Sequence, residues 1–341
     1  MDSEFLQKYS IMQWDEYMML NRERSSINKK ISDKVITKRE LLLHFKIELS
    51  LLKLCKRKIK GLGNTNEVVA NQALVFLCDN IIIIFHNIHF YFNIGQDLLT
   101  TFINVCEDNV SCLNAKQLNI LMEVVMKHTP SNQNIWIRLI KLYLNLKSLE
   151  PDALLCAFDQ GVRALDDALP LWKTLIRHVQ YKLPEIVSKL YEQATKGTKD
   201  FYNERLSLEI RPKYLEWCIG CKDINAARHL FNELKELKPA CRKLYLVMIA
   251  IERDEPNYEL DTVRKLYQEV TKLCGHDNIG VWIDYMRFEQ EYGNKRLING
   301  ICCTAICKLQ KDLFSTLMEE KRGLDSELWS ALSKEVIVID E

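Results

Sequence analysis

The stretch that decides the fold is residues 279–309, IGVWIDYMRFEQEYGNKRLINGICCTAICKL. Its first half places Trp282, Tyr285 and Phe288 three residues apart, which puts the three aromatic side chains on one face of a helix. A break at Gly293 follows, and a second apolar run begins after it. Neither short helix can bury its apolar face alone. The stretch therefore predicts a helix pair that packs against similar neighbouring pairs.

Two sequence signatures recur upstream, in phase with each other. One is an apolar residue, an aromatic residue, two polar residues and a small or apolar residue, as in LYQEV at residues 266–270. Its marker positions, Phe158, Tyr191, Phe231, Tyr267 and Cys302, lie 33, 40, 36 and 35 residues apart. Periods of this size are typical of helix-pair solenoids. The predicted fold class is all-α, an α-solenoid of antiparallel helix pairs with an N-terminal helical segment. The residues expected to pack within the repeats are Trp136, Trp172, Tyr191, Trp217, Phe231, Tyr245, Tyr267, Trp282, Tyr285 and Phe288.

Composition and patterning divide the chain into four segments. We expect a basic helical segment at residues 1–60, an apolar helical connector at 61–130, about five helix pairs at 131–310, and a helix with an acidic tail at 311–341. Residues 1–60 carry 14 Lys and Arg against 8 Asp and Glu, whereas residues 312–341 carry 3 against 8. The whole chain has a net charge of only +1, which argues against a wholly electrostatic nucleic-acid binder.

The twelve cysteines lie inside helical apolar patterns, and the N-terminal residues lack the apolar core of a signal peptide. We therefore expect reduced, buried thiols in a cytosolic or nuclear protein. Cys218 and Cys221 have CxxC spacing, but no second CxxC or histidine pair completes a zinc or redox motif. No phosphate-binding glycine loop, GxSxG or HExxH motif is present. The sequence predicts no catalytic residue, metal site or cofactor.

A basic run ends the first long predicted helix, which begins at the Thr37–Glu40 capping box. Its cations favour the negative end of the helix dipole, and they equally fit a nuclear-import or RNA-phosphate contact. The two interpretations are compatible. The residues concerned are Lys53, Lys56, Arg57, Lys58 and Lys60.

The apolar run at residues 73–94 is interrupted by polar residues, so we interpret it as a buried helix or a strand rather than a membrane span. Its His86 and His89 are expected to be core residues. Prolines are expected in the first turn of helices, at Pro170, Pro184 and Pro212.

The end of the chain predicts one or two further helices within residues 312–333, around Trp329. The last stretch, residues 336–341 (VIVIDE), resembles a SUMO-interacting motif, with a frayed terminus as the other interpretation.

The W-x-x-Y-x-x-F-E first helix, followed by an aromatic-containing second helix, resembles the HAT (half-a-tetratricopeptide) repeat. Residues 211–239 and 261–309 resemble, more closely, the HAT-repeat family of the small-subunit processome, the U-three small nucleolar RNA-associated protein six family of the UtpB subcomplex. Residues 37–58 resemble the N-terminal helix of that family. Three features depart from it: a shortened middle, cysteines at 302 and 303 where aromatics are usual, and Cys218 at a glutamate-like position.

The resemblance implies a scaffold without enzyme activity that acts in nucleolar ribosomal RNA processing, in 18S maturation and processome assembly. Its implied partners are WD-repeat and other processome proteins, with the small nucleolar ribonucleoprotein and precursor ribosomal RNA contacted indirectly. The implied location is the nucleus and nucleolus. Two alternatives stay open: a HAT-repeat scaffold in pre-mRNA splicing or 3′-end processing, and a membrane-anchored helical scaffold.

Overall fold

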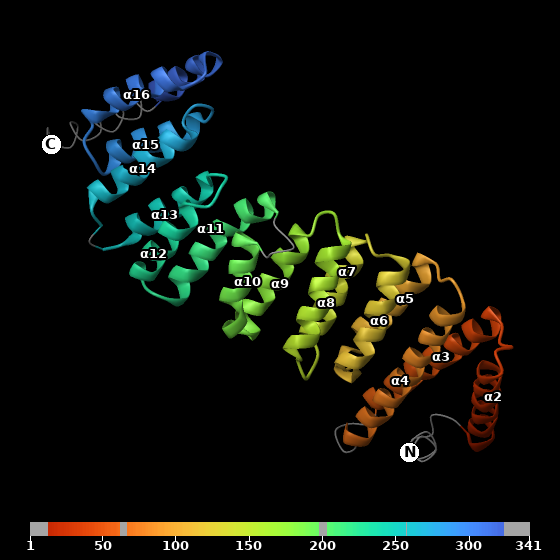
Figure 1. Ribbon diagram of the computed structural model, residues 1–341. Coiled ribbons are helices and arrows are strands. Elements are labelled where there is room, and N and C mark those ends of the chain that lie inside the picture. Colours follow the sequence, from red (N-terminus) through yellow and green to blue (C-terminus); the bar gives the residue numbers. More distant parts are fainter. Residues whose placement is uncertain (1–12, 62–66, 198–202, 257, 324–341) are drawn as a thin grey trace, which may run out of the picture. The chain divides into compact units, whose positions relative to one another are not determined.

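The protein is all-α throughout the residues described by the computed structural model, which are 13–61, 67–197, 203–256 and 258–323 (Figure 1). Each regular element in these ranges is an α-helix or a short 3-10 helix. The all-α fold class of antiparallel helix pairs is thereby confirmed. Residues 314–323 are helical, whereas Trp329 and the 336–341 tail lie outside the described ranges.

The chain divides into two compact units, residues 1–185 and 186–341. This division does not test the predicted segment boundaries near residues 60, 130 and 310, which stay predictions. The helices of the first unit are α2 (Trp14–Ser32), α3 (Lys38–Gly61), α4 (Glu67–Tyr91), α5 (Gln96–Asp108), η2 (Val110–Cys112), α6 (Ala115–His128), α7 (Gln133–Leu144), α8 (Pro151–Ala164) and α9 (Leu169–Lys182). Those that follow are α10 (Pro184–Lys196), α11 (Glu204–Cys221), α12 (Ile224–Lys235), α13 (Arg242–Asp254), α14 (Leu260–Cys274), α15 (Ile279–Glu291), α16 (Leu297–Lys308) and η3 (Lys311–Leu313).

The apolar run of the first unit forms the long helix α4, not a strand. Its Phe85 ring stacks on Phe102 of α5 with centroids 3.7 Å apart, and Phe45 of α3 lies 6.0 Å from Phe85. Residues Asn71–Tyr91 are long and apolar enough to cross a membrane, but half of the most apolar window is buried inside the protein. Helix α4 packs on α3 and α6, so these contacts favour a core helix of a packed unit.

Local capping signals set several helix starts as the sequence predicts. Thr37 N–H donates to Glu40 Oε2 at 2.9 Å, and Glu40 N–H donates back to Thr37 Oγ1 at 3.3 Å, which confirms the capping box. Proline lies in the first turn of α9 at Pro170 and begins α10 at Pro184. These positions leave no lost backbone hydrogen bond, because the first amides of a helix have no intrahelical partner.

The prediction that Pro212 begins a helix is wrong. Helix α11 begins eight residues earlier, where Asn203 caps it by accepting a hydrogen bond from Leu206 N–H at 2.9 Å, and Pro212 lies in its interior. An interior proline leaves the carbonyl four residues before it without a backbone donor. Here that carbonyl belongs to Leu208, and the Cys241 thiol donates to it at 3.4 Å. A neighbouring helix pair therefore satisfies the group that the proline frees.

The cysteines are only partly buried, which corrects the expectation of a fully buried set. Seven of them are buried and Cys274 is half-buried, but four are exposed. The exposed ones are Cys156, Cys221, Cys303 and Cys307. The CxxC pair is split between the two classes, with Cys218 buried and Cys221, the last residue of α11, exposed.

Candidate interaction surfaces

The aromatic stripe of α15 forms the centre of its helix pair. Trp282, Tyr285 and Phe288 are all buried, and the Tyr285 ring stacks on Tyr267 of α14 with centroids 4.9 Å apart. The Trp282 indole N–H donates to the Gly275 carbonyl at 2.7 Å, across the turn between the two helices. The same device recurs in the first unit, where the Trp136 indole donates to the Pro130 carbonyl at 2.7 Å.

The structure places nearly all of the predicted packing residues in the interior. Trp217 is half-buried and the other nine are buried. Six of them, together with Phe158 and Tyr214, form pairs that join a second helix to the next first helix. These pairs are Phe158 with Trp172, Tyr191 with Tyr214, Phe231 with Tyr245, and Tyr267 with Tyr285, at centroid distances of 4.7, 4.8, 5.1 and 4.9 Å. Such aromatic pairs add roughly 0.5–1.5 kcal/mol beyond the area they bury.

A part-buried arginine–glutamate pair joins α14 to α15, and sequence reasoning missed it. Arg264 Nε and Nη2 donate to the two carboxylate oxygens of Glu289 at 2.7 and 2.9 Å, and Asn294 N–H donates to the same carboxylate at 2.8 Å. Burial opposes ionisation of Glu289, but the hydrogen bonds from Arg264 and Asn294 outweigh it and keep its pKa below the ordinary value.

The same pair recurs at matching spacing. Arg228 of α12 binds Glu252 of α13 through two hydrogen bonds of 2.8 and 2.7 Å. Arg24 of α2 binds Glu48 of α3 at 2.7 and 2.9 Å. In all three cases an arginine precedes, by 24 or 25 residues, a glutamate of the next helix. That spacing is the signal by which the sequence could have revealed the pairs.

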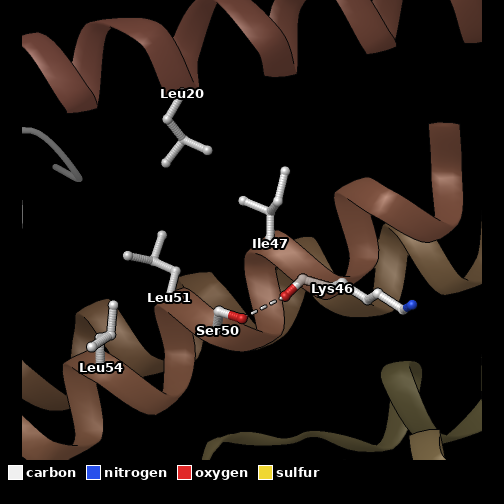
Figure 2. Close-up of a pocket in the computed structure, with 6 residues that line it drawn as sticks. All are labelled: Leu20, Lys46, Ile47, Ser50, Leu51 and Leu54. Carbon is white, nitrogen blue, oxygen red and sulfur yellow. Dashed lines mark hydrogen bonds between the residues drawn. The ribbon is translucent and has the colours of Figure 1, made fainter.

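The N-terminal helix pair is therefore joined in the same way as the C-terminal pairs. Between α2 and α3 lies an apolar pocket of about 300 Å³ (Figure 2). In Figure 2, Leu20 extends from one helix toward Ile47 and Leu51 on the other. The hydroxyl of Ser50 donates to the Lys46 carbonyl of its own helix at 2.9 Å, so the pocket wall presents mainly hydrocarbon.

The predicted basic residues continue along α3 beyond this pocket. Lys53, Arg57, Lys58 and Lys60 are exposed, whereas Lys56 is half-buried and its ammonium donates to the Asp108 carbonyl at 2.7 Å. Lys56 thus ties the end of α3 to the end of α5. The other four side chains stand in solvent with their positive charges, and their functional role stays a prediction.

Two grooves of the second unit occupy equivalent places in successive repeats. One lies over α13 between α12 and α14, with a volume of about 540 Å³, and contains the Arg228–Glu252 pair and a Lys235–Glu269 ion pair. The other lies over α15 between α14 and α16, with a volume of about 400 Å³. Trp282 and Tyr285 form its floor, and the nearby side chains are cationic or uncharged.

Two of the three histidines near the end of α4 are in direct contact. His89 Nδ1 lies 2.8 Å from His128 Nε2 of α6, so these nitrogens share one proton, and the ring of His86 is 6.2 Å away from that of His89. Burial, followed by the nearby charges of Lys127 and His128, lowers the pKa of His89 to about 4. Within the described ranges, no group of three or more His, Cys, Asp or Glu side chains is arranged to hold a metal ion.

These helix pairs match a known family at the level of sequence. A sequence model for the family described as "U3 small nucleolar RNA-associated protein 6 C-terminal" matches residues 111–302, more than half of the chain. The human U3 small nucleolar RNA-associated protein 6 homolog is 26% identical over 83 residues, which cover 24% of this chain and 14% of that relative. Its mouse counterpart is 24% identical over 83 residues, with the same two coverages.

The aligned stretch is thus a small part of these relatives, and the α2–α3 pair lies outside the family match. The match nevertheless runs from residue 111 in η2 to residue 302 in α16. It contains the aromatic pairs, two of the arginine–glutamate pairs, the groove over α13 and most of the groove over α15, of which Thr304 and Lys308 lie beyond it. The resemblance drawn from the repeats is confirmed, and the chain belongs to the U3 small nucleolar RNA-associated protein 6 family.

Proposed function

We propose that this protein is a non-enzymatic scaffold in U3 small nucleolar RNA-associated processing of precursor ribosomal RNA. The observation that carries the proposal is the family match over residues 111–302. The names of the human and mouse relatives associate those proteins with U3 small nucleolar RNA. More specifically, we propose that the protein acts in 18S maturation and in assembly of the small-subunit processome, in the nucleolus.

The physical basis of the scaffold role is the repeated groove. Successive helix pairs bury their apolar faces against one another and leave their grooves open to partners. Extended peptides and partner helices are the ligands that such surfaces accommodate. We propose WD-repeat and other processome proteins as direct partners, with the small nucleolar ribonucleoprotein and precursor ribosomal RNA reached through them.

Depletion followed by RNA blotting tests this role. Loss of the protein should lower small-subunit ribosomal RNA and raise its precursors, while large-subunit RNA is spared. Re-expression of the wild-type chain should restore the 18S level. A depleted cell with normal ribosomal RNA but fewer spliced or cleaved messages would overturn the proposal in favour of the messenger-RNA alternative. Recovery of the tagged chain in the membrane fraction would instead favour Asn71–Tyr91 as an anchor.

We further propose that the basic end of α3 contacts RNA or an import receptor. The four exposed cations, Lys53, Arg57, Lys58 and Lys60, should act there, and their joint replacement by alanine should reduce nuclear accumulation or RNA association. The melting temperature should change little, because none of the four is buried. Lys56→Ala is the matched control, since its ammonium holds the Asp108 carbonyl; it should lower stability slightly and leave localisation intact. Unchanged localisation and RNA association in the fourfold variant would leave these charges with a helix-end role only.

A further inference from the structure

The second helices α10, α12, α14 and α16 differ in how charge is paired across the three grooves between them. Across the first of these grooves, Lys196 of α10 pairs with Glu233 of α12 at 3.1 Å. Across the next, Lys235 of α12 pairs with Glu269 of α14 at 3.2 Å. The two glutamates hold the same repeat position, two residues after the aromatic markers Phe231 and Tyr267. Each of these grooves is therefore bridged by a carboxylate of the chain itself.

The last groove, between α14 and α16, lacks that carboxylate. The position of Glu233 and Glu269 is occupied by Thr304, whose hydroxyl donates to the Gly300 carbonyl of its own helix at 2.8 Å. Lys272 holds the repeat position of Lys196, five residues after the aromatic marker. Within the described part of the chain, no carboxylate oxygen lies within 4.0 Å of the Lys272 or Lys308 ammonium. Lys272 thus keeps the cation of the bridge, whereas Thr304 replaces the glutamate that would pair with it.

The lining of this groove is suited to an acidic ligand with an apolar neighbour. Lys272 and Lys308 border the groove, and the Lys308 ammonium lies 5.8 Å from the centroid of the Trp282 ring. Leu297, which is 42% exposed, and Ile301 supply hydrocarbon along α16. A Cβ at Gly300 would have no neighbouring atom within 4 Å, so the surface of α16 leaves space for a ligand at this point. The preceding groove, by contrast, is lined by Glu252, Glu259 and Glu269 as well as by cations.

We propose that the α14–α16 groove binds an acidic, leucine-type apolar segment of a partner protein. A carboxylate of that segment would pair with Lys272 and Lys308, in the place that the chain's own glutamates fill in the two preceding grooves. An apolar side chain beside it would pack on Leu297 and Ile301. The proposal rests on the scaffold role only in requiring a protein partner, and it names the chemistry by which that partner is recognised.

A peptide fits this groove better than single-stranded RNA. RNA-binding grooves combine a track of several cations with aromatic faces on which bases stack. Here two lysines lack a carboxylate partner, and the aromatic floor is closed, since Trp282 is 2% exposed and Tyr285 is 6% exposed. Arg264, which also borders the groove, is already bound to Glu289. Most of the remaining accessible surface is hydrocarbon, beside the exposed Gln268 and Thr304, and protein segments match such a mixture.

Fluorescence polarisation with the full chain tests the proposal. The probe is a fluorescein-labelled synthetic peptide that alternates glutamate with leucine, and the comparison peptide carries lysine in place of glutamate. We expect the acidic peptide to bind and the basic one not to bind. Affinity should fall as salt rises, because exposed charges are screened. The double variant Lys272→Ala, Lys308→Ala should bind about tenfold more weakly. Lys265→Ala, in the preceding groove, is the control and should change affinity less than twofold.

Thr304→Glu is the sharpest variant, because it supplies the missing carboxylate from within the chain. It should weaken peptide binding about tenfold without lowering the melting temperature, by competing with the ligand for Lys272. Thr304→Gln, which is similar in size and uncharged, should bind as the wild type does. Equal binding by the Thr304→Glu variant and the wild type would overturn the proposal.

Two further measurements identify other occupants. If oligouridylate binds more tightly than the acidic peptide and its binding is lost in the lysine double variant, the groove takes RNA and the proposal fails. If light scattering finds a dimer of the wild type that Thr304→Glu abolishes, the occupant is a second copy and the proposal also fails. None of these measurements depends on ribosomal RNA processing. Normal peptide binding with no depletion phenotype would therefore refute the pathway alone, whereas the reverse result would refute the groove alone.

Discussion

Two helix pairs of the second unit, α10–α11 and α14–α15, contain the same aromatic stack. Tyr191 stacks on Tyr214 with centroids 4.8 Å apart and an interplanar angle of 4°, and Tyr267 stacks on Tyr285 at 4.9 Å and 4°. A threonine follows each second-helix tyrosine by four residues. The Thr195 hydroxyl donates to the Tyr191 carbonyl at 2.8 Å, and the Thr271 hydroxyl donates to the Tyr267 carbonyl at 2.8 Å. The stack is thus reproduced in both geometry and local hydrogen bonding.

The two pairs differ in where they hold a buried cation. In α14–α15, Arg264 binds Glu289 while Trp282 fills the centre of the repeat. In α10–α11 the corresponding positions are Ser188, Cys218 and Arg211. The arginine and the glutamate are lost together, so neither is left buried without its partner. The departure at Cys218 is therefore one half of a matched replacement.

Arg211 takes the place of the tryptophan and also of its hydrogen bond. Its side chain is fully buried, and its guanidinium donates to the carbonyls of Leu237, Lys238 and Pro239 at 2.7–3.0 Å, and to Ser207 Oγ at 3.0 Å. A tryptophan donates one hydrogen bond to a neighbouring turn, whereas this arginine donates four. The comparison teaches that the aromatic stack fixes the spacing of the pair, and that its polar interior can be built in two ways.

The largest effect should come from removing the central side chain of α15. Trp282→Ala should cost about 3–5 kcal/mol of unfolding free energy, because a large cavity opens and the Gly275 carbonyl loses its donor. Urea unfolding followed by circular dichroism measures the change. Trp217→Ala, in α11, is the control and should cost less, since Trp217 is only half-buried. Equal costs for the two variants would contradict the assignment of Trp282 to the centre.

The arginine–glutamate pair should come next. Glu289→Gln removes the charge that Arg264 binds, and we expect a loss of about 2–3 kcal/mol, below the range for fully buried pairs because Arg264 is 22% exposed. The double variant Arg264→Ser, Glu289→Cys reproduces the residues of α10–α11. It should cost less than the sum of its two single variants, by about 1–2 kcal/mol of coupling energy in a double-mutant cycle. Additive losses would show that the two side chains are not energetically linked.

The parts of this comparison that the sequence reveals are those with a local period. Aromatic residues at regular spacing predicted the stack, because helix geometry turns spacing directly into a shared face. The arginine–glutamate pairs join two helices over 24 or 25 residues, and no helical period points to such a contact. Arg211 was missed for a similar reason, since its acceptors are backbone carbonyls more than 25 residues away, which carry no side-chain signature.

Other elements show the same limit. The apolar run of α4 has no clear period because it is buried against several neighbours, so helix and strand could not be told apart from its sequence. Pro212 was misassigned because the tertiary contact from Cys241 compensates for an interior proline. Thr304 occupies the repeat position of Glu269, but the loss of an ion pair across the last groove can be recognised only once the helices that face each other are known.

Low pH should destabilise α14–α15 more than α10–α11, by less than the substitutions described above. The folded pKa of Glu289 lies below its ordinary value of 4.5, so the unfolded chain takes up a proton first as the pH falls. The stability that Glu289 contributes is complete above that value and is lost as the pH drops through the folded pKa. Its loss cannot exceed that of Glu289→Gln, since a protonated carboxyl resembles the amide. Hydrogen exchange at low pH should show α14–α15 opening before α10–α11. In the Glu289→Gln variant, lowering the pH should not change which of the two pairs opens first.

The first unit supplies an internal reference for that experiment. Burial and nearby positive charges lower the pKa of His89 from 6.5 to about 4, so the unfolded chain again binds a proton first. The stability from neutral His89 is complete above pH 6.5 and decreases as the pH falls toward 4. Hydrogen exchange in α4 and α6 should therefore rise over this higher window. His89→Phe should reduce that dependence to the part contributed by His128, whose pKa is also lowered by burial, without changing the acid response of α14–α15.

The smallest effect should appear where the first of the two second helices, α10, ends. Helix α10 is followed by Gly197 with φ of 78°, a left-handed conformation that other residues adopt at a cost. Gly197→Ala should cost about 1 kcal/mol, and Gly197→Asn less, because asparagine tolerates this conformation. Helix α14 ends at Gly275 with an ordinary φ of −80°, but a Cβ there would overlap the Thr271 carbonyl and approach the Trp282 ring. Asparagine should therefore be no better than alanine at Gly275. A rescue by asparagine at Gly275, or its failure at Gly197, would show by urea unfolding that the two glycines are not required for these separate reasons.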